Sequence, residues 1–204
     1  VVLYTNDKEV QHSYIAEAKD KSYDVLILDG PIISHLIQKL EAEKENISFV
    51  RVDADSIDKL IKKGDDIPSV LSESDEKSLK EMIESIVSKD QYAVQFESLS
   101  PDSTPFVITR SEFMRRMKEM SASGGGGMFG MENMPEMYNL VVNANHPLVS
   151  KVLSEKKSDN QKSMLKAATD LAKLSQGLLK GEELTAFIKT RYNFRIIFDF
   201  LFNI

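Results

Sequence analysis

The stretch Tyr23-Asp-Val-Leu-Ile-Leu-Asp29, which runs into Gly30-Pro31, decides the fold of the first third of this chain. It contains a short apolar strand at 24–29, and similar runs lie at 1–5 (VVLYT) and 47–52 (ISFVRV). Between these runs apolar residues recur at helical spacing. Alternating strand and helix predicts parallel strands joined by right-handed crossovers. With a last helix at about 56–63, residues 1–63 are predicted to form a small three-layer α/β subdomain.

A subdomain of this kind could bind a nucleotide, and this enzyme class is the first alternative. However, the first strand runs into Thr5-Asn-Asp-Lys8, and the chain contains neither GxGxxG nor GxxxxGK(S/T). Of the three histidines, His12 and His35 lie in helical stretches without a second ligand at metal spacing, and His146 precedes Pro147 at a helix start. We therefore expect no catalytic residue and no metal site, and a nucleotide titration would test the alternative.

Composition limits the possible partners and the compartment. The chain has 204 residues, a net charge of -6 and no cysteine. It shows no basic stripe for nucleic acid and no apolar run of about 18–20 residues that would span a membrane. A chain without disulfides or thiolate sites fits the reducing cytoplasm. Because the sequence begins at Val1 directly in an apolar strand, we expect further residues upstream.

Periodicity is lost at 64–74, where Gly, Pro, Ser and acidic residues predict a linker before a second domain at 75–204. Thr109 and Glu112 have capping-box spacing, which predicts that a helix starts there. The domain is of the α+β class. Its expected elements are a helix at about 75–88, strands at 92–99 and 106–109, a helix at 110–122, a strand at 138–143 and a helix at 146–154.

Seven of the nine methionines lie between Met114 and Met137, around four glycines at 124–127. The predicted helix at 110–122 carries an apolar stripe, formed by Phe113, Met114, Met117 and Met120. Methionine side chains repack easily, so such a stripe suits a surface that contacts many apolar partners. Burial in the core is the alternative, and a Cu(I) site is disfavoured because no Cys or His lies nearby.

Two helices complete the ordered pattern, at about 159–179 and after Gly181. Their apolar residues occupy more than one face, which is more than one small domain can cover. A C2-symmetric four-helix bundle with a second copy is the simplest arrangement, and docking on the chain's own domain is the alternative. The residues expected at this dimer contact are Leu165, Ala168, Leu171, Ala172, Leu178, Leu184, Phe187 and Ile188.

Several of these segments together resemble a known family, the heat-shock protein 90 chaperones of the bacterial HtpG type. Residues 1–63 resemble the end of that family's middle domain, and the remainder resembles its C-terminal domain. The segments that carry the resemblance are Tyr23–Asp29, Ser111-Glu-Phe-Met-Arg-Arg-Met-Lys118, Tyr138-Asn-Leu-Val-Val-Asn143, His146-Pro-Leu-Val149 and Leu171-Ala-Lys-Leu-Ser-Gln-Gly-Leu-Leu-Lys-Gly181. The likeness extends to about Lys189, after which residues 190–204 are more aromatic than the family's ending.

The resemblance implies a stress-response chaperone that is homodimeric, cytoplasmic and driven by ATP. ATP and Mg would be bound in an N-terminal domain outside this sequence, so residues 1–204 would hold no cofactor and would not be an enzyme. This part would supply homodimerisation through residues 159–190. It would also contact unfolded or partly folded client proteins through the Met-rich helix.

Overall fold

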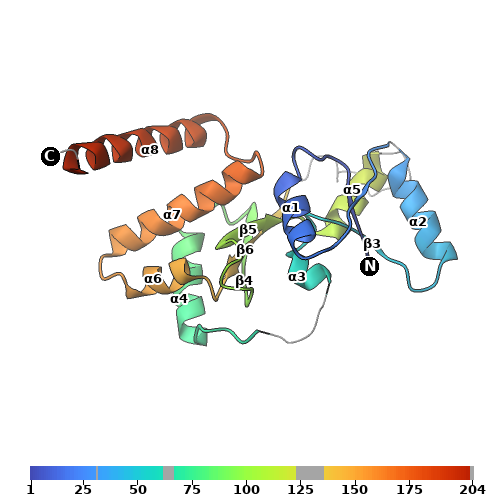
Figure 1. The fold of residues 1–204 in the computed structure, drawn as a ribbon, viewed down its shortest axis with the longest axis horizontal. Helices are drawn as coiled ribbons and strands as arrows, with labels where there is room; N and C mark the ends of the chain where they lie inside the picture. Colours follow the sequence, from blue (N-terminus) through green and yellow to red (C-terminus); the bar gives the residue numbers. More distant parts are fainter. Residues whose placement is uncertain (31, 62–66, 123–135, 203–204) are drawn as a thin grey trace.

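The computed structural model describes residues 1–30, 32–61, 67–122 and 136–202 (Figure 1). It contains two three-stranded sheets surrounded by helices, which confirms the mixed α/β class. The strands are β1 (Val2–Thr5), β2 (Leu26–Ile27), β3 (Phe49–Arg51), β4 (Tyr92–Glu97), β5 (Phe106–Thr109) and β6 (Tyr138–Asn143). The helices are α1 (His12–Asp20), α2 (Ile33–Glu43), α3 (Ile57–Leu60), α4 (Glu73–Glu84), α5 (Glu112–Ala122), α6 (Pro147–Ser154), α7 (Ser158–Ser175) and α8 (Gly181–Phe202).

The first sheet has the order β2-β1-β3 and is parallel, as the strand and helix alternation predicts. Its central strand alternates between two buried faces. Leu3 packs with Tyr14 of α1 in one cluster, while Tyr4 packs with Ile37 of α2 in another. Helices therefore cover both faces, although β2 has only two residues and both are exposed.

The second sheet has the order β4-β6-β5, with β4 parallel and β5 antiparallel to β6. The two strands that follow each other in the chain thus do not pair, because β6 lies between them. Its residues Leu140, Val141 and Val142 are fully buried, as expected for a central strand covered on both faces.

One face of this second sheet also contacts the part of the chain that contains the first sheet and α1 to α3, here called the first unit; the second sheet and the elements from α4 onward form the second unit. Val107 of β5 and Val141 of β6 belong to the same hydrophobic cluster as Leu3 and Tyr14. The Tyr14 hydroxyl donates a hydrogen bond to the carbonyl of Ile108, and burial raises the pKa of this hydroxyl well above its ordinary value. The two units therefore share a core, while their division at residues 64–74 stays a prediction.

The opposite face packs against α4, α6 and α7. Leu79, Ile83, Val149, Val152 and Leu165 from these helices are buried in one cluster with β4, β5 and β6. None of these five side chains is more than about one per cent exposed. This cluster is the largest core among the described residues.

The capping box predicted at Thr109 is wrong. Thr109 is the last residue of β5, its buried hydroxyl has no hydrogen-bond partner, and α5 begins only at Glu112. A capping box occurs instead at α4, where the Ser72 side chain accepts from the Asp75 backbone N–H and the Asp75 carboxylate accepts from Ser72. Consequently α4 begins at Glu73, earlier than predicted.

The predicted helix at 159–179 ends earlier, at Ser175. Gly177 adopts a φ of 64°, its N–H donates to the carbonyl of Leu174, and the N–H of Leu178 donates to the carbonyl of Lys173. These two bonds form a Schellman motif, for which glycine is favoured because it has no Cβ. Gly181, which the sequence suggested as the separator, lies at the start of α8 and also has a positive φ of 56°.

Helix α8 lies at one end of the molecule, beside α7 and away from both sheets (Figure 1). It is the longest helix in the described part of the chain, with 22 residues. In the same part, no helix combines the length and apolar character required to cross a membrane.

Candidate functional site

The Met-rich helix α5 packs on the first unit. It follows β5 in the chain, but it lies beside α2 and apart from the helices that cover the second sheet (Figure 1). Phe113 is 68% exposed, Met114 is 38% exposed, and Met117 is half-buried. The side chain of Met120 lies outside the described residues. Two large apolar side chains therefore face solvent near the start of this helix.

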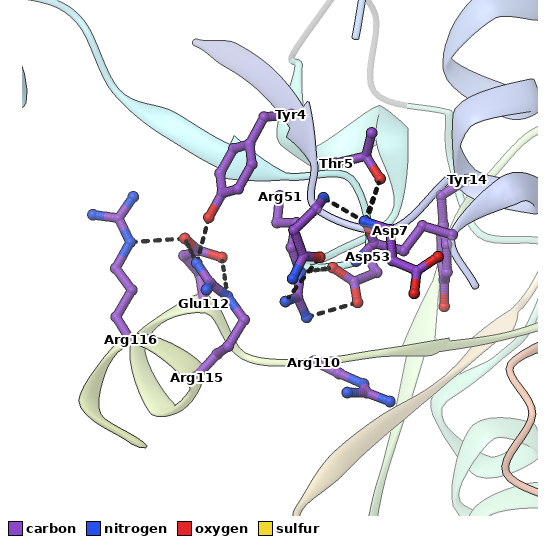
Figure 2. A network of polar contacts seen from close by, with 12 residues as sticks. Tyr4, Thr5, Asp7, Tyr14, Arg51, Asp53, Arg110, Glu112, Arg115 and Arg116 are labelled. Carbon is purple, nitrogen blue, oxygen red and sulfur yellow. Dashed lines mark hydrogen bonds and ion pairs between the residues drawn. The ribbon is translucent and has the colours of Figure 1, made fainter. Parts of the chain in front are cut away.

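The other side of α5 is held by charged side chains. Arg115 donates to both carboxylate oxygens of Glu112, at 3.2 Å from Nε and 2.5 Å from Nη2, and Nη2 also donates to the Tyr4 hydroxyl at 2.6 Å. Its guanidinium lies 5.9 Å from the centre of the Tyr4 ring. Figure 2 shows Tyr4, Glu112 and Arg115 converging between the helix and the first sheet. This contact joins α5 to β1.

Arg116 extends the anchor to α2 and β3. Its Nη1 and Nη2 bond the two carboxylate oxygens of Glu41 at 2.7 and 3.1 Å, and Nη2 also donates to the carbonyl of Phe49 at 2.6 Å. Its Nε donates to Glu112 at 2.7 Å. Hydrogen bonds from Arg116 lower the pKa of Glu41, and those to Glu41 raise the pKa of Arg116. Bidentate guanidinium and carboxylate geometry makes this a directional contact.

A cavity of about 260 Å³ lies between α2 and α5. Its apolar lining comes from Ile37, Phe113 and Met117, together with the Tyr4 ring. Both arginines of the anchor line it as well. The exposed side of α5 thus continues into a hollow shared with the first unit.

Three methionines of the cluster, Met128, Met131 and Met134, lie outside the described residues, and so does their Met-x-x-Met spacing, which would suit thioether ligands for Cu(I). Met137 is described and is exposed. Among the residues that the structure describes, no group of three or more His, Cys, Asp or Glu could hold a metal ion.

The predicted dimer residues fall into three groups. Leu165, Ala168 and Ala172 are buried in the chain's own core, and Leu178 packs partly against it. Leu171 and Ile188 are exposed, at 51% and 43%. Leu184 and Phe187 are half-buried. The first group has a packing role within one chain, and as dimer contacts all eight residues stay a prediction.

An open groove of about 590 Å³ runs along the exposed side of α7. Its apolar lining includes Phe106, Leu148, Met164 and Leu171. Leu174, which the sequence analysis did not single out, is also exposed on α7. The exposed surface of α7 therefore includes two large apolar side chains near its C-terminal end, beside the groove.

A second polar contact links the two units behind α5. Arg51 donates to both oxygens of Asp53, at 2.5 Å from Nε and 2.9 Å from Nη2, and both side chains are only 7% exposed. The carbonyl of Asp53 accepts from the backbone N–H of Arg110 at 2.9 Å. Figure 2 shows this pair between β3 and the start of α5. The carboxylate of Asp53 thus pairs with the buried charge of Arg51, and its backbone carbonyl bonds the segment that leads into α5.

Sequence reasoning did not find these anchoring residues. The spacing of Glu112 with Arg115 and Arg116, at i+3 and i+4, is a helix-surface signal that could have indicated their pairing. Glu41 lies 75 residues from Arg116 in the chain, and no local pattern connects them.

Comparison with known proteins identifies the family. No protein-family model matches the chain. The chaperone protein HtpG of Porphyromonas gingivalis is 38% identical over 177 residues, which is 85% of this chain and 26% of the relative. HtpG of Bacteroides fragilis is 36% identical over 189 residues, covering 90% of the chain and 28% of the relative. HtpG of Bacteroides thetaiotaomicron is 38% identical over 161 residues, covering 78% and 24%.

The chain spans about a quarter of the length of the curated relatives it matches. The matches nevertheless cover most of the chain, and they agree with the resemblance carried by its own segments. This chain belongs to the HtpG-type chaperones of the heat-shock protein 90 family.

Proposed function

We propose that residues 1–204 bind unfolded or partly folded client proteins through α5 and join two copies of the chaperone through α7 and α8. The observation that carries the client contact is the exposure of Phe113 and Met114 on a helix whose other side is anchored by Arg115 and Arg116. An apolar surface that is exposed, on a helix whose orientation is fixed, suits contact with client proteins of many different sequences. The alternative, in which the Met face is buried, is disfavoured by the exposure of these two side chains.

Client contact at this surface would be weak and adaptable. Methionine and phenylalanine offer dispersion contacts without demanding one partner shape, and methionine repacks at low cost. A dimer would present two such surfaces, and bivalent contact would raise the overall affinity. The cytoplasmic location and an ATP cycle in the whole chaperone, with ATP and Mg bound outside residues 1–204, belong to the same proposal.

Replacing Phe113, Met114 and Met117 with Ser is expected to weaken client binding by about tenfold, equivalent to about 1.4 kcal/mol. The apolar contact area is lost, while the arginine anchor of α5 stays intact. Fluorescence anisotropy of a labelled, permanently unfolded polypeptide measures the affinity.

The matched control replaces three other exposed apolar residues, Val10, Ile67 and Val70, with Ser. It should leave the affinity unchanged. Equal weakening in both triple variants would show that clients bind any exposed apolar side chain without preference for α5. Unfolding of the first variant would show that its three residues are needed for the fold. Either result contradicts the proposal.

Removal of α8 beyond its first turn is expected to raise the dimer dissociation constant by at least about tenfold. A longer truncation that also removed α7 would be unsuitable, because it would delete Leu165 from the core. A chain that ends after Thr185 keeps all of α7 and the first turn of α8. Sedimentation equilibrium gives the dissociation constant, and circular dichroism with a thermal melt shows whether the fold is retained. A full-length chain that is already monomeric would overturn the self-association proposal.

A further inference from the structure

Lys173, near the end of α7, is a buried cation. The residue is only 5% exposed, and lysine is almost never buried this deeply without a partner. Its Nζ donates to both carboxylate oxygens of Glu183 at 3.1 Å and lies 5.2 Å from the centre of the Tyr92 ring. The ammonium group is therefore held between the first turn of α8 and strand β4.

The backbone of the same residue holds the link between the helices. The carbonyl of Lys173 accepts from the N–H of Leu178 at 2.9 Å and from the N–H of Leu179 at 3.3 Å. The side chain of Leu179 is buried, and Leu178 packs against the main core. One residue thus bonds both the short link at 176–180 and the helix that follows it.

Few other polar contacts determine the direction of α8. Within the described residues, no other side-chain hydrogen bond or ion pair joins α8 to the rest of the chain. Figure 1 shows α8 lying along α7 at the edge of the molecule, apart from both sheets. Glu183 also lies in the first turn of α8, where a negative charge is favoured by the helix dipole.

We propose that Lys173 is a positioning residue, which sets the angle of α8 to α7 by joining Glu183 to the Tyr92 ring. The consequence for a second copy rests on the proposed self-association through these helices. The angle that Lys173 sets between α7 and α8 determines the orientation in which α8 is presented to the second copy. Lys173 would then act on dimer affinity without touching the partner.

The test measures the angle inside one chain. The protein has no cysteine, so Ser163→Cys on α7 and Lys189→Cys on α8 accept a single pair of spin labels at exposed positions. Labelled chain is diluted into excess unlabelled chain, so that only distances within one chain are recorded. The variants are Lys173→Met, Lys173→Arg and Glu183→Gln, and the control is Lys166→Met. Lys166 is an exposed lysine of the same helix, and its ion-pair partner Asp170 also lies on α7.

The unsubstituted chain and K166M are expected to give one narrow distance distribution. K173M and E183Q should give a clearly broadened one, and K173R should restore the narrow one because arginine keeps both the charge and the contact with the ring. If K173M fails to fold, the distance distribution of E183Q tests the inference instead, because Glu183 is exposed and its substitution leaves the core unchanged. Narrow distributions in E183Q and in any folded K173M would overturn the inference.

A second measurement separates this inference from the proposed function. Sedimentation equilibrium should show a dimer dissociation constant raised about tenfold by K173M or E183Q and unchanged by K166M. If the unsubstituted chain does not dimerise, the self-association proposal fails while the distance measurement still tests Lys173. If it dimerises and neither the distances nor the dissociation constant change in the variants, the inference fails and the self-association proposal stands.

Discussion

Leu165→Ala is expected to lower the free energy of unfolding by about 2–5 kcal/mol, whether or not the chain dimerises. Leu165 is only 1% exposed within a single chain, in the cluster formed by α4, α6, α7 and the second sheet. Truncation removes buried methyl groups and leaves a cavity that the surrounding strands and helices cannot fill. Urea unfolding at two protein concentrations at least tenfold apart measures the loss, which should be the same at both.

The matched control is Leu171→Ala, six residues later on the same helix. Leu171 is 51% exposed, so its truncation should change the unfolding free energy of the monomer by less than about 0.5 kcal/mol. If the chain dimerises through α7 and α8 as proposed, Leu171→Ala should raise the dissociation constant of the dimer instead. Equal losses of monomer stability from the two substitutions would show that α7 does not pack as described.

Asp53→Ala is expected to lower the free energy of unfolding by about 3–5 kcal/mol. The substitution leaves the Arg51 guanidinium buried without its carboxylate, and the low exposure of this pair keeps water from replacing the lost hydrogen bonds. The loss should also loosen the segment that enters α5, since the Asp53 carbonyl bonds the N–H of Arg110. Chemical denaturation gives the stability, and hydrogen exchange at Arg110 reports the local effect.

Asp58→Ala provides the comparison. Asp58 pairs with Lys21, and its side chain is 40% exposed, so the loss should not exceed about 1 kcal/mol. Comparable losses from Asp53→Ala and Asp58→Ala would mean that the Arg51 and Asp53 pair contributes no more than a surface ion pair.

Much of the fold was predictable from local pattern. Strands β5 and β6 have the bounds that their β-branched runs predict, and β1 and β3 differ by one or two residues at their ends. Short continuous apolar runs set these elements, because a strand that is covered on both faces buries successive side chains. Strands β2 and β4 are shorter than predicted, and the other errors occurred at helix ends, where a single residue can set the boundary. Gly177 terminates α7 through its left-handed backbone conformation, and Ser72 caps α4 through a side-chain oxygen.

The candidate surface was only partly predictable. The helical stripe correctly placed Phe113 and Met114 together on α5, but its spacing was equally compatible with a buried face. Arg115 and Arg116 hold the helix from its other side, and Phe113 and Met114 are left exposed. On α7 the same kind of stripe divides, because Leu165 faces the second sheet while Leu171 faces solvent.

By itself the sequence determined the elements, the parallel first sheet and the HtpG family, because all three depend on local runs and continuous motifs. Only the tertiary structure decided which apolar residues are buried and which charged residues pair. Arg116 and Glu41 are 75 residues apart, and Arg115 and Tyr4 are 111 residues apart. Such contacts depend on how separate elements meet in space. An apolar stripe on a helix has the same sequence pattern whether it is covered by the core of its own chain, by a second copy or by a client protein.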